Sequence, residues 1–274
     1  SADEFHLAVE SGRVTPPGGE AIAMRPSRLA VTDFAGAVTP ADITIAAEGR
    51  AADILALIDE PPLGLVSKLG LDPASVGGRA AVTAELGFPL VDDLDLDRVE
   101  VTAEATLADP RLTLTPMGRT FRIAAERLAL RATGARLEIR GDARVNGLAV
   151  AADYVETFSG PSAGRRVSLR GPVRPEDLRA EGLEVPGFAG GRADVTLELT
   201  QRDGPVEVEI DADLARAALA VDPLRWQKPA GEGGRARLSV RLGDGAAIDR
   251  LEVEAGALAL AGSVAFTPAG DLAE

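Results

Sequence analysis

Residues 99–107 (VEVTAEATL) alternate apolar and polar side chains without a break. Successive side chains of a β-strand point to opposite faces of the sheet, so this strand would carry one apolar face and one charged face. Strands of parallel sheets are buried on both faces and are apolar throughout. The stretch therefore predicts an antiparallel sheet with one face in water.

The same alternation recurs over residues 82–88, 195–199, 206–211, 238–242 and 251–254. Turn signals such as Asn146-Gly147 and Gly243-Asp244-Gly245 separate these segments, and the patterns together predict roughly sixteen strands. Their apolar residues are the candidates for lining a hydrophobic ligand site. They are Val82, Leu86, Val99, Val101, Leu107, Val195, Leu197, Leu199, Val206, Val208, Ile210, Leu238, Val240, Leu251 and Val253.

Two segments interrupt the alternation and predict helices. Ile54, Leu55 and Ile58 have helical spacing, and the pattern resumes after two prolines, so residues 51–70 predict a short helical hairpin. The alanine-rich residues 213–220 predict a second short helix. A loop near residues 159–164 suggests a first part, residues 1–158, and a second part, residues 159–274, although one continuous domain fits the pattern as well.

Composition excludes several functions. A net charge of −14 without a basic stripe argues against nucleic-acid binding. The chain has no cysteine and its one histidine is His6, so thiolate chemistry, a Ser-His-Asp triad and the usual zinc sites are all disfavoured. We expect no catalytic residue, no cofactor and no metal, and therefore not an enzyme.

Two further features have a structural interpretation that we prefer. The acidic run at residues 92–97 lacks the glycine and glutamate of an EF-hand loop, so Asp93, Asp95 and Asp97 are interpreted as the solvated face of a strand. Trp226 could contact a ligand, but packing at the start of a strand is the more frequent role of a lone tryptophan. Neither feature predicts a metal or ligand site.

An antiparallel sheet must cover its apolar face with a second sheet, with helices, by barrel closure or with a ligand. Two short helical segments cannot cover about sixteen strands. Aromatic residues make up only 3% of the chain, fewer than the thick core of a sandwich or barrel usually needs. The expected fold is therefore all-β with a few short helices, a long twisted antiparallel sheet curled into an apolar groove.

Two segments carry a resemblance to a known family. One is the hairpin ILALIDEPPL at residues 54–63, followed by LGLDP at residues 69–73. The other is DADLARAAL at residues 211–219, followed by LRWQKPAG at residues 224–231 and GALALAGSV at residues 256–264. In this order the motifs resemble the central region of YhdP-type members of the AsmA-like family, over residues 40–267.

The resemblance implies a bridge-like lipid transfer protein, anchored in the inner membrane and extending through the periplasm. Phospholipid acyl chains would lie in the β-groove, and the phospholipid would pass between the inner and outer membranes. This transport would serve outer membrane biogenesis. The chain starts at Ser1 and has no apolar run long enough to span a membrane, so we expect a section of a longer protein whose other parts contact the membranes.

Two alternatives remain open from the sequence. The first is a non-transporting periplasmic scaffold or assembly factor that pairs exposed edge strands with outer-membrane or periplasmic proteins. The second is an enzyme or sugar-binding β-solenoid, which the scarcity of aromatic residues disfavours.

Overall fold

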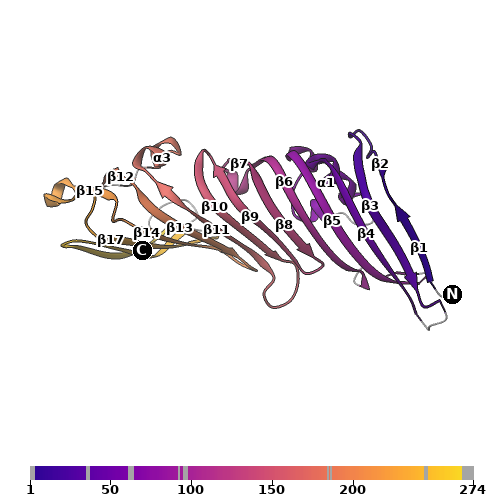
Figure 1. Cartoon of the computed structure of the whole chain (residues 1–274). Helices are drawn as coiled ribbons and strands as arrows, with labels where there is room; N and C mark the ends of the chain where they lie inside the picture. The colour runs from indigo at the N-terminus through magenta and orange to yellow at the C-terminus, as the bar shows by residue number, and fades with distance from the viewer. Residues whose placement is uncertain are drawn as a thin grey trace. The chain divides into compact units, whose positions relative to one another are not determined.

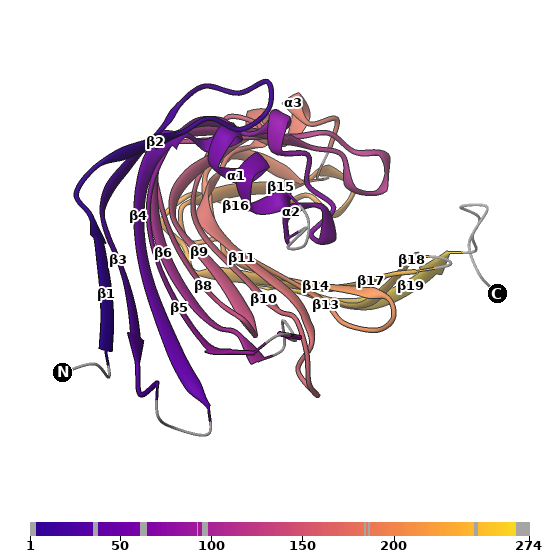
Figure 2. The ribbon, with the colours of Figure 1, turned by 90° about the vertical axis from the view of Figure 1, so that its right-hand side faces the viewer.

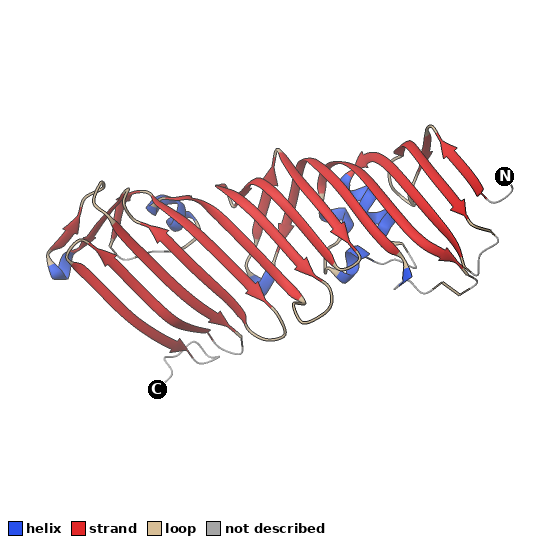
Figure 3. Ribbon diagram, turned by 60° about the horizontal axis from the view of Figure 1, so that its bottom comes forward, coloured by secondary structure: helices blue, strands red, loops and turns tan. Residues whose placement is uncertain are grey.

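The computed structural model describes residues 4–34, 38–60, 65–91, 93–94, 98–183, 185, 187–243 and 246–266. The chain divides into two compact units, Ser1–Ala143 and Arg144–Glu274, which are described separately. Sixteen of the described strands belong to main-sheet pairings, nine of them in the first unit and seven in the second, and the registers are antiparallel. Strands dominate both units, with a few short helices beside them (Figure 3).

The first unit is built from nine strands. Five of them are hydrogen-bonded in the order β1-β3-β4-β5-β6, and β2 pairs with β3 (Figure 1). Strand β6 pairs with both β7 and β8, and β8 also pairs with β9. The strands are β1 (Glu4–Val9), β2 (Gly12–Val14), β3 (Ile22–Thr32), β4 (Thr39–Arg50), β5 (Gly77–Leu90), β6 (Glu100–Leu114), β7 (Phe121–Ala125), β8 (Arg127–Thr133) and β9 (Arg136–Val145).

Strand β6 changes partners at Asp109, which has a left-handed φ of 50°. Residues before it pair with β8 and residues after it pair with β7. On the neighbouring strand, Gly78 has a φ of 98°, and a Cβ there would lie 2.6 Å from the carbonyl oxygen of Ala108. Only glycine fits this approach, and the register of β5 with β6 shifts at this point, between Gly77 and Arg79.

Two short helices lie on the concave side of the curved strands of the first unit (Figure 2). They are α1 (Ala51–Asp59) and α2 (Leu65–Lys68), so the predicted helical hairpin at residues 51–70 is confirmed. Ile54 of α1 packs in a buried cluster with Ile22 of β3, Ala80 of β5 and Val76, which directly precedes β5. A short 3-10 turn, η1 (Pro73–Ser75), leads into β5.

The second unit contributes seven strands to main-sheet pairings, in the order β10-β11-β13-β14-β17-β18-β19. They are β10 (Leu148–Thr157), β11 (Gly164–Val173), β13 (Ala193–Gln201), β14 (Val206–Asp213), β17 (Gly234–Leu242), β18 (Ala246–Ala255) and β19 (Leu258–Phe266). The loop at residues 159–163 is the connection between β10 and β11.

A separate three-stranded sheet in the second unit consists of β12 (Phe188–Gly191), β15 (Ala217–Val221) and β16 (Trp226–Lys228). Ala217 and Leu214 of this region are buried against Ala193 and Ala212 of the main sheet. The small sheet therefore covers one end of an apolar surface. Trp226 is half-buried and begins β16, after the 3-10 turn η4 (Asp222–Leu224).

The predicted helix at residues 213–220 is wrong. Asp213 ends β14 opposite Arg235, and residues 217–221 form β15. The backbone N–H of Ala215 donates to the Asp213 carboxylate at 2.8 Å, and the Ala217 N–H donates to the Leu214 carbonyl at 3.0 Å. This tight turn and the pairing of β15 with two other strands outweigh the helical propensity of alanine.

The sequence patterns did not predict helix α3 (Pro175–Ala180). Its signal is a proline at the first helical position followed by Asp177, whose carboxylate accepts the Arg174 N–H at 2.9 Å. The interpretation of Asp93 as part of a strand face is wrong, because Asp93 and Leu94 lie in a bend between the end of β5 and the start of β6. Asp92 and residues 95–97 of the acidic run lie outside the described residues. Within the described ranges, no helix has the length and hydropathy to cross a membrane.

The predicted fold class is confirmed: the protein is mostly β, with curled antiparallel pairing and a few short helices.

Candidate functional site

The strand registers of the first unit collect apolar side chains on one face. Leu7 lies opposite Leu29, Leu29 opposite Ile43, and Ile43 opposite Leu86, which lies opposite Val101. A second row runs through Met24, Ala47, Val82, Ala105, Leu130 and Ile139. We call the side of the sheet that carries these two rows the apolar face of the first unit. Helix α1 packs on this face through Val82 and Ala47.

The second unit has an equivalent apolar face. Leu199 lies opposite Val167 on one side and opposite Val208 on the other, and Val208 lies opposite Val240. The next row runs through Leu169, Leu197, Ile210, Leu238 and Leu251. Because each register pairs the apolar positions of one strand with the apolar positions of the next, these positions stay on one face from strand to strand.

All but one of the fifteen predicted lining residues lie in paired strands on these two faces. Val82, Leu86, Val101 and Leu107 lie on the first, and Val99 comes directly before β6. The other ten lie on the apolar face of the second unit: Val195, Leu197, Leu199, Val206, Val208, Ile210, Leu238, Val240, Leu251 and Val253. The same alternation, applied to β4 and β8, would also have found Ile43, Ile45, Leu128 and Leu130.

These side chains are only partly covered. Of the fifteen, Val206 is buried and the others are half-buried. The whole chain exposes 17197 Å². Two separate compact domains of half the chain each would together expose about 13,500 Å². The whole chain therefore exposes more surface than two compact domains would, and the half-buried apolar rows are part of that surface.

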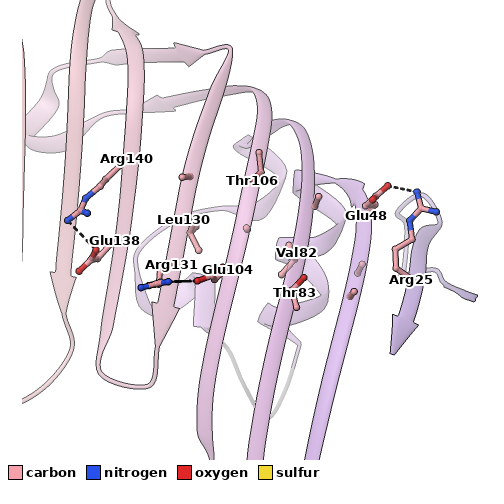
Figure 4. Close-up of a pocket in the computed structure, with 15 residues that line it drawn as sticks. Arg25, Glu48, Val82, Thr83, Glu104, Thr106, Leu130, Arg131, Glu138 and Arg140 are labelled. Carbon is pink, nitrogen blue, oxygen red and sulfur yellow. Dashed lines mark hydrogen bonds and ion pairs between the residues drawn. The ribbon is translucent and has the colours of Figure 1, made fainter. Parts of the chain in front are cut away.

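The opposite face of the first unit is polar. Arg25 Nη2 donates to Glu48 Oε2 at 2.7 Å, Arg131 pairs with Glu104, and Arg140 Nη2 lies 3.3 Å from Glu138 Oε2 (Figure 4). Small residues between these pairs leave a depression of about 570 Å³. The hydrogen bond from Arg25 lowers the pKa of Glu48, so this exposed carboxylate stays ionised at neutral pH.

This face has a structural role that its chemistry explains. Cross-strand ion pairs on an exposed sheet contribute little to stability, typically below about 1 kcal/mol each. They keep one face of the sheet hydrated, and they fix which face of each strand is in water. On the second unit the pairs between Arg235 and Asp211 and between Arg241 and Asp249 do the same.

The residues that a hydrolytic or metal site would need are not assembled in the described part of the chain. His6 is exposed on β1, where its ring contacts Glu4 and Arg28. Within the described ranges, no group of three or more histidine, aspartate or glutamate side chains could hold a metal ion. The arrangement that the structure does provide is an extended apolar surface with a charged reverse side.

Comparisons with known proteins add no identity. No protein-family model, no curated protein and no solved structure matches this chain.

Proposed function

We propose that this chain binds the acyl chains of lipids along the apolar faces of its two units. As part of a longer, inner-membrane-anchored AsmA-like protein of the periplasm, it would conduct phospholipid between the inner and outer membranes. Neither activity requires a catalytic residue or a cofactor. Contacts with the membranes belong to parts of the protein outside these residues.

The observation that carries this proposal is the partial exposure of the in-register apolar rows. Transfer of an acyl chain from water to an apolar surface gains about 0.8 kcal/mol for each CH₂. The rows consist mostly of valine, leucine and alanine, so successive positions offer an acyl chain similar contacts. Such a surface holds lipid without a single strong site, which suits movement along it.

Native mass spectrometry of the purified chain, followed by lipid extraction, tests the proposal. Co-purified phospholipid, displaced by added fatty acid, is the expected result. A chain that is folded by circular dichroism and carries no lipid, even after incubation with phospholipid vesicles, would contradict the proposal.

A non-transporting scaffold is the second candidate, and strand β19, which pairs only with β18 among the described residues, favours it. Residues 258–266 contain no charged side chain, and Leu260 is 51% exposed. Edge strands without charges pair readily with other strands. Dimerisation or capture of a β-strand peptide by a lipid-free chain, abolished by Ala261→Lys, would support the scaffold over the lipid surface.

A further inference from the structure

One charged cross-strand pair interrupts the apolar face of the second unit. On β10 this face continues from Ala152 and Tyr154 to Glu156, which lies opposite Arg165 of β11. Arg165 in turn lies opposite Gln201 of β13. Among the paired positions of this face that the structure describes, Glu156 and Arg165 are the only charged ones.

Tyr154 joins this pair to the apolar rows. Its hydroxyl donates to Oε2 of Glu156, and its ring lies opposite Val167. Burial, and secondarily the hydrogen bond to Glu156, raises the pKa of the Tyr154 hydroxyl, which therefore stays neutral at physiological pH. The half-buried ring of Tyr154 thus borders the apolar rows, while its hydroxyl oxygen lies at Glu156.

Arg165 lies at the end of β11 that packs against the end of β13. Gly164, with a φ of 133°, packs so closely on the end of β13 that a Cβ there would lie 2.3 Å from the Gln201 carbonyl oxygen and 3.1 Å from Arg202 Cα. Arg165 is exposed. It forms no ion pair within the described residues, unlike many arginines of the polar face.

We propose that Arg165 and Glu156 form a binding site for the headgroup of a zwitterionic, amine-bearing phospholipid. The inference rests on the proposed function, because the acyl chains of that lipid would lie on Val167 and Leu199. A guanidinium presents paired N–H donors that match phosphate oxygens, and a carboxylate is the natural partner of an ammonium group. The site fixes one end of the lipid where the apolar rows end.

The chain offers a matched control in Arg166. It is the next residue on β11, is also exposed, and lies opposite Val155 and Thr200, so its side chain is on the polar face. Arg165→Gln and Arg166→Gln remove the same charge from the same strand. Only the first removes it from the proposed site.

Isothermal titration calorimetry with short-chain lipids distinguishes binding of the headgroup from binding of the acyl chains. For the unaltered chain, dihexanoyl-phosphatidylethanolamine should bind more tightly than dihexanoylglycerol, and phosphoethanolamine without acyl chains should bind weakly. Arg165→Gln should weaken binding of phosphatidylethanolamine about tenfold and leave dihexanoylglycerol unchanged, whereas Arg166→Gln should change neither. Glu156→Gln should weaken phosphatidylethanolamine but not phosphatidylglycerol, which carries no amine.

Equal effects of the two arginine variants, or equal affinity of the unaltered chain for the diacylglycerol and the phospholipid, would overturn the headgroup site while acyl-chain binding stands. Tight binding of phosphoethanolamine alone would overturn it too, because the site would then be an anion site independent of lipid. If the unaltered chain binds none of the lipids, the proposed function itself fails.

Discussion

Val208 of β14 lies directly opposite Val240 of β17, and one residue earlier Glu207 lies opposite Arg241 on the other face of the same two strands. The two pairs are neighbours in sequence, but one faces apolar side chains and the other faces water. Because of this separation, single substitutions at adjacent residues act on opposite surfaces of the sheet.

Val208→Asp should reduce lipid binding about tenfold, because it places an ionised carboxylate where an acyl chain would lie. Val208 is half-buried, so we expect the variant to remain folded. Lipid bound per chain, measured after extraction, gives the result. Glu207→Lys on the polar face is the control and should bind as the unaltered chain does; a comparable loss in both variants would contradict the assignment of faces.

Lys228→Met should lower the free energy of unfolding by about 2–4 kcal/mol. Lys228 is only 1% exposed, and its Nζ donates to the carbonyl oxygens of Leu214 and Ala217, both at 2.8 Å. The methionine side chain fills the space but removes the ammonium donor that both carbonyls share, so the Leu214 carbonyl keeps only the Ala217 N–H. Urea unfolding measures the change. Gln227→Met, at the exposed neighbouring residue, should alter stability by less than about 0.5 kcal/mol.

Ile54→Ala should destabilise the chain by about 2–4 kcal/mol, because the side chain fixes α1 to the apolar face of the first unit. Leu57, on the same helix, is 36% exposed and is the control. Leu57→Ala should cost less than about 1 kcal/mol in the same denaturation experiment. Similar costs for both variants would mean that α1 is not packed as described.

The stability of the helical hairpin should depend on pH through Asp59. Its Oδ1 accepts the N–H groups of Val66 and Ser67 at 2.9 and 2.8 Å, and its Oδ2 accepts the Ser67 hydroxyl. The hydrogen bond from the Ser67 hydroxyl is the main cause that lowers the pKa of Asp59 below 3.8. A lowered folded pKa means that this stabilisation is complete above pH 3.8 and is lost as the pH falls through the folded value.

NMR titration of the Val66 and Ser67 amide shifts tests this dependence. The expected midpoint lies below pH 3.8, and Asp59→Asn should abolish the transition. A midpoint at or above 3.8 in the unaltered chain would contradict the hydrogen bonding described for Asp59.

The alternation in the sequence was sufficient to predict the main sheet because period two is a local property. Val206, Val208 and Ile210 share a face wherever their strand lies, and pairing with Leu242, Val240 and Leu238 only extends the pattern. The hairpin near Ile54 was predictable for the same reason, since helical spacing and the following prolines are local signals.

The parts that were not predicted depend on contacts between distant residues. Residues 217–219 form a strand because they pair with Gly191, Gly190 and Phe188, which no local pattern reveals. Lys228 would be assigned to the surface by its residue type. In the folded chain it is buried, and its ammonium group donates to two backbone carbonyl groups that come together only on folding. Glu156 and Arg165 likewise look like ordinary surface charges until the register places them on the apolar face.

Site-specific photocrosslinking along β14 tests the central claim most directly. A photoreactive amino acid is introduced in turn at Val206, Glu207, Val208, Glu209 and Ile210 in cells that make the full-length protein, and crosslinked lipid is detected by labelled phosphate. We expect lipid adducts at Val208 and Ile210 and none at Glu207 and Glu209. Adducts at both sets of positions, or at neither, would contradict the claim that lipid lies on the apolar face.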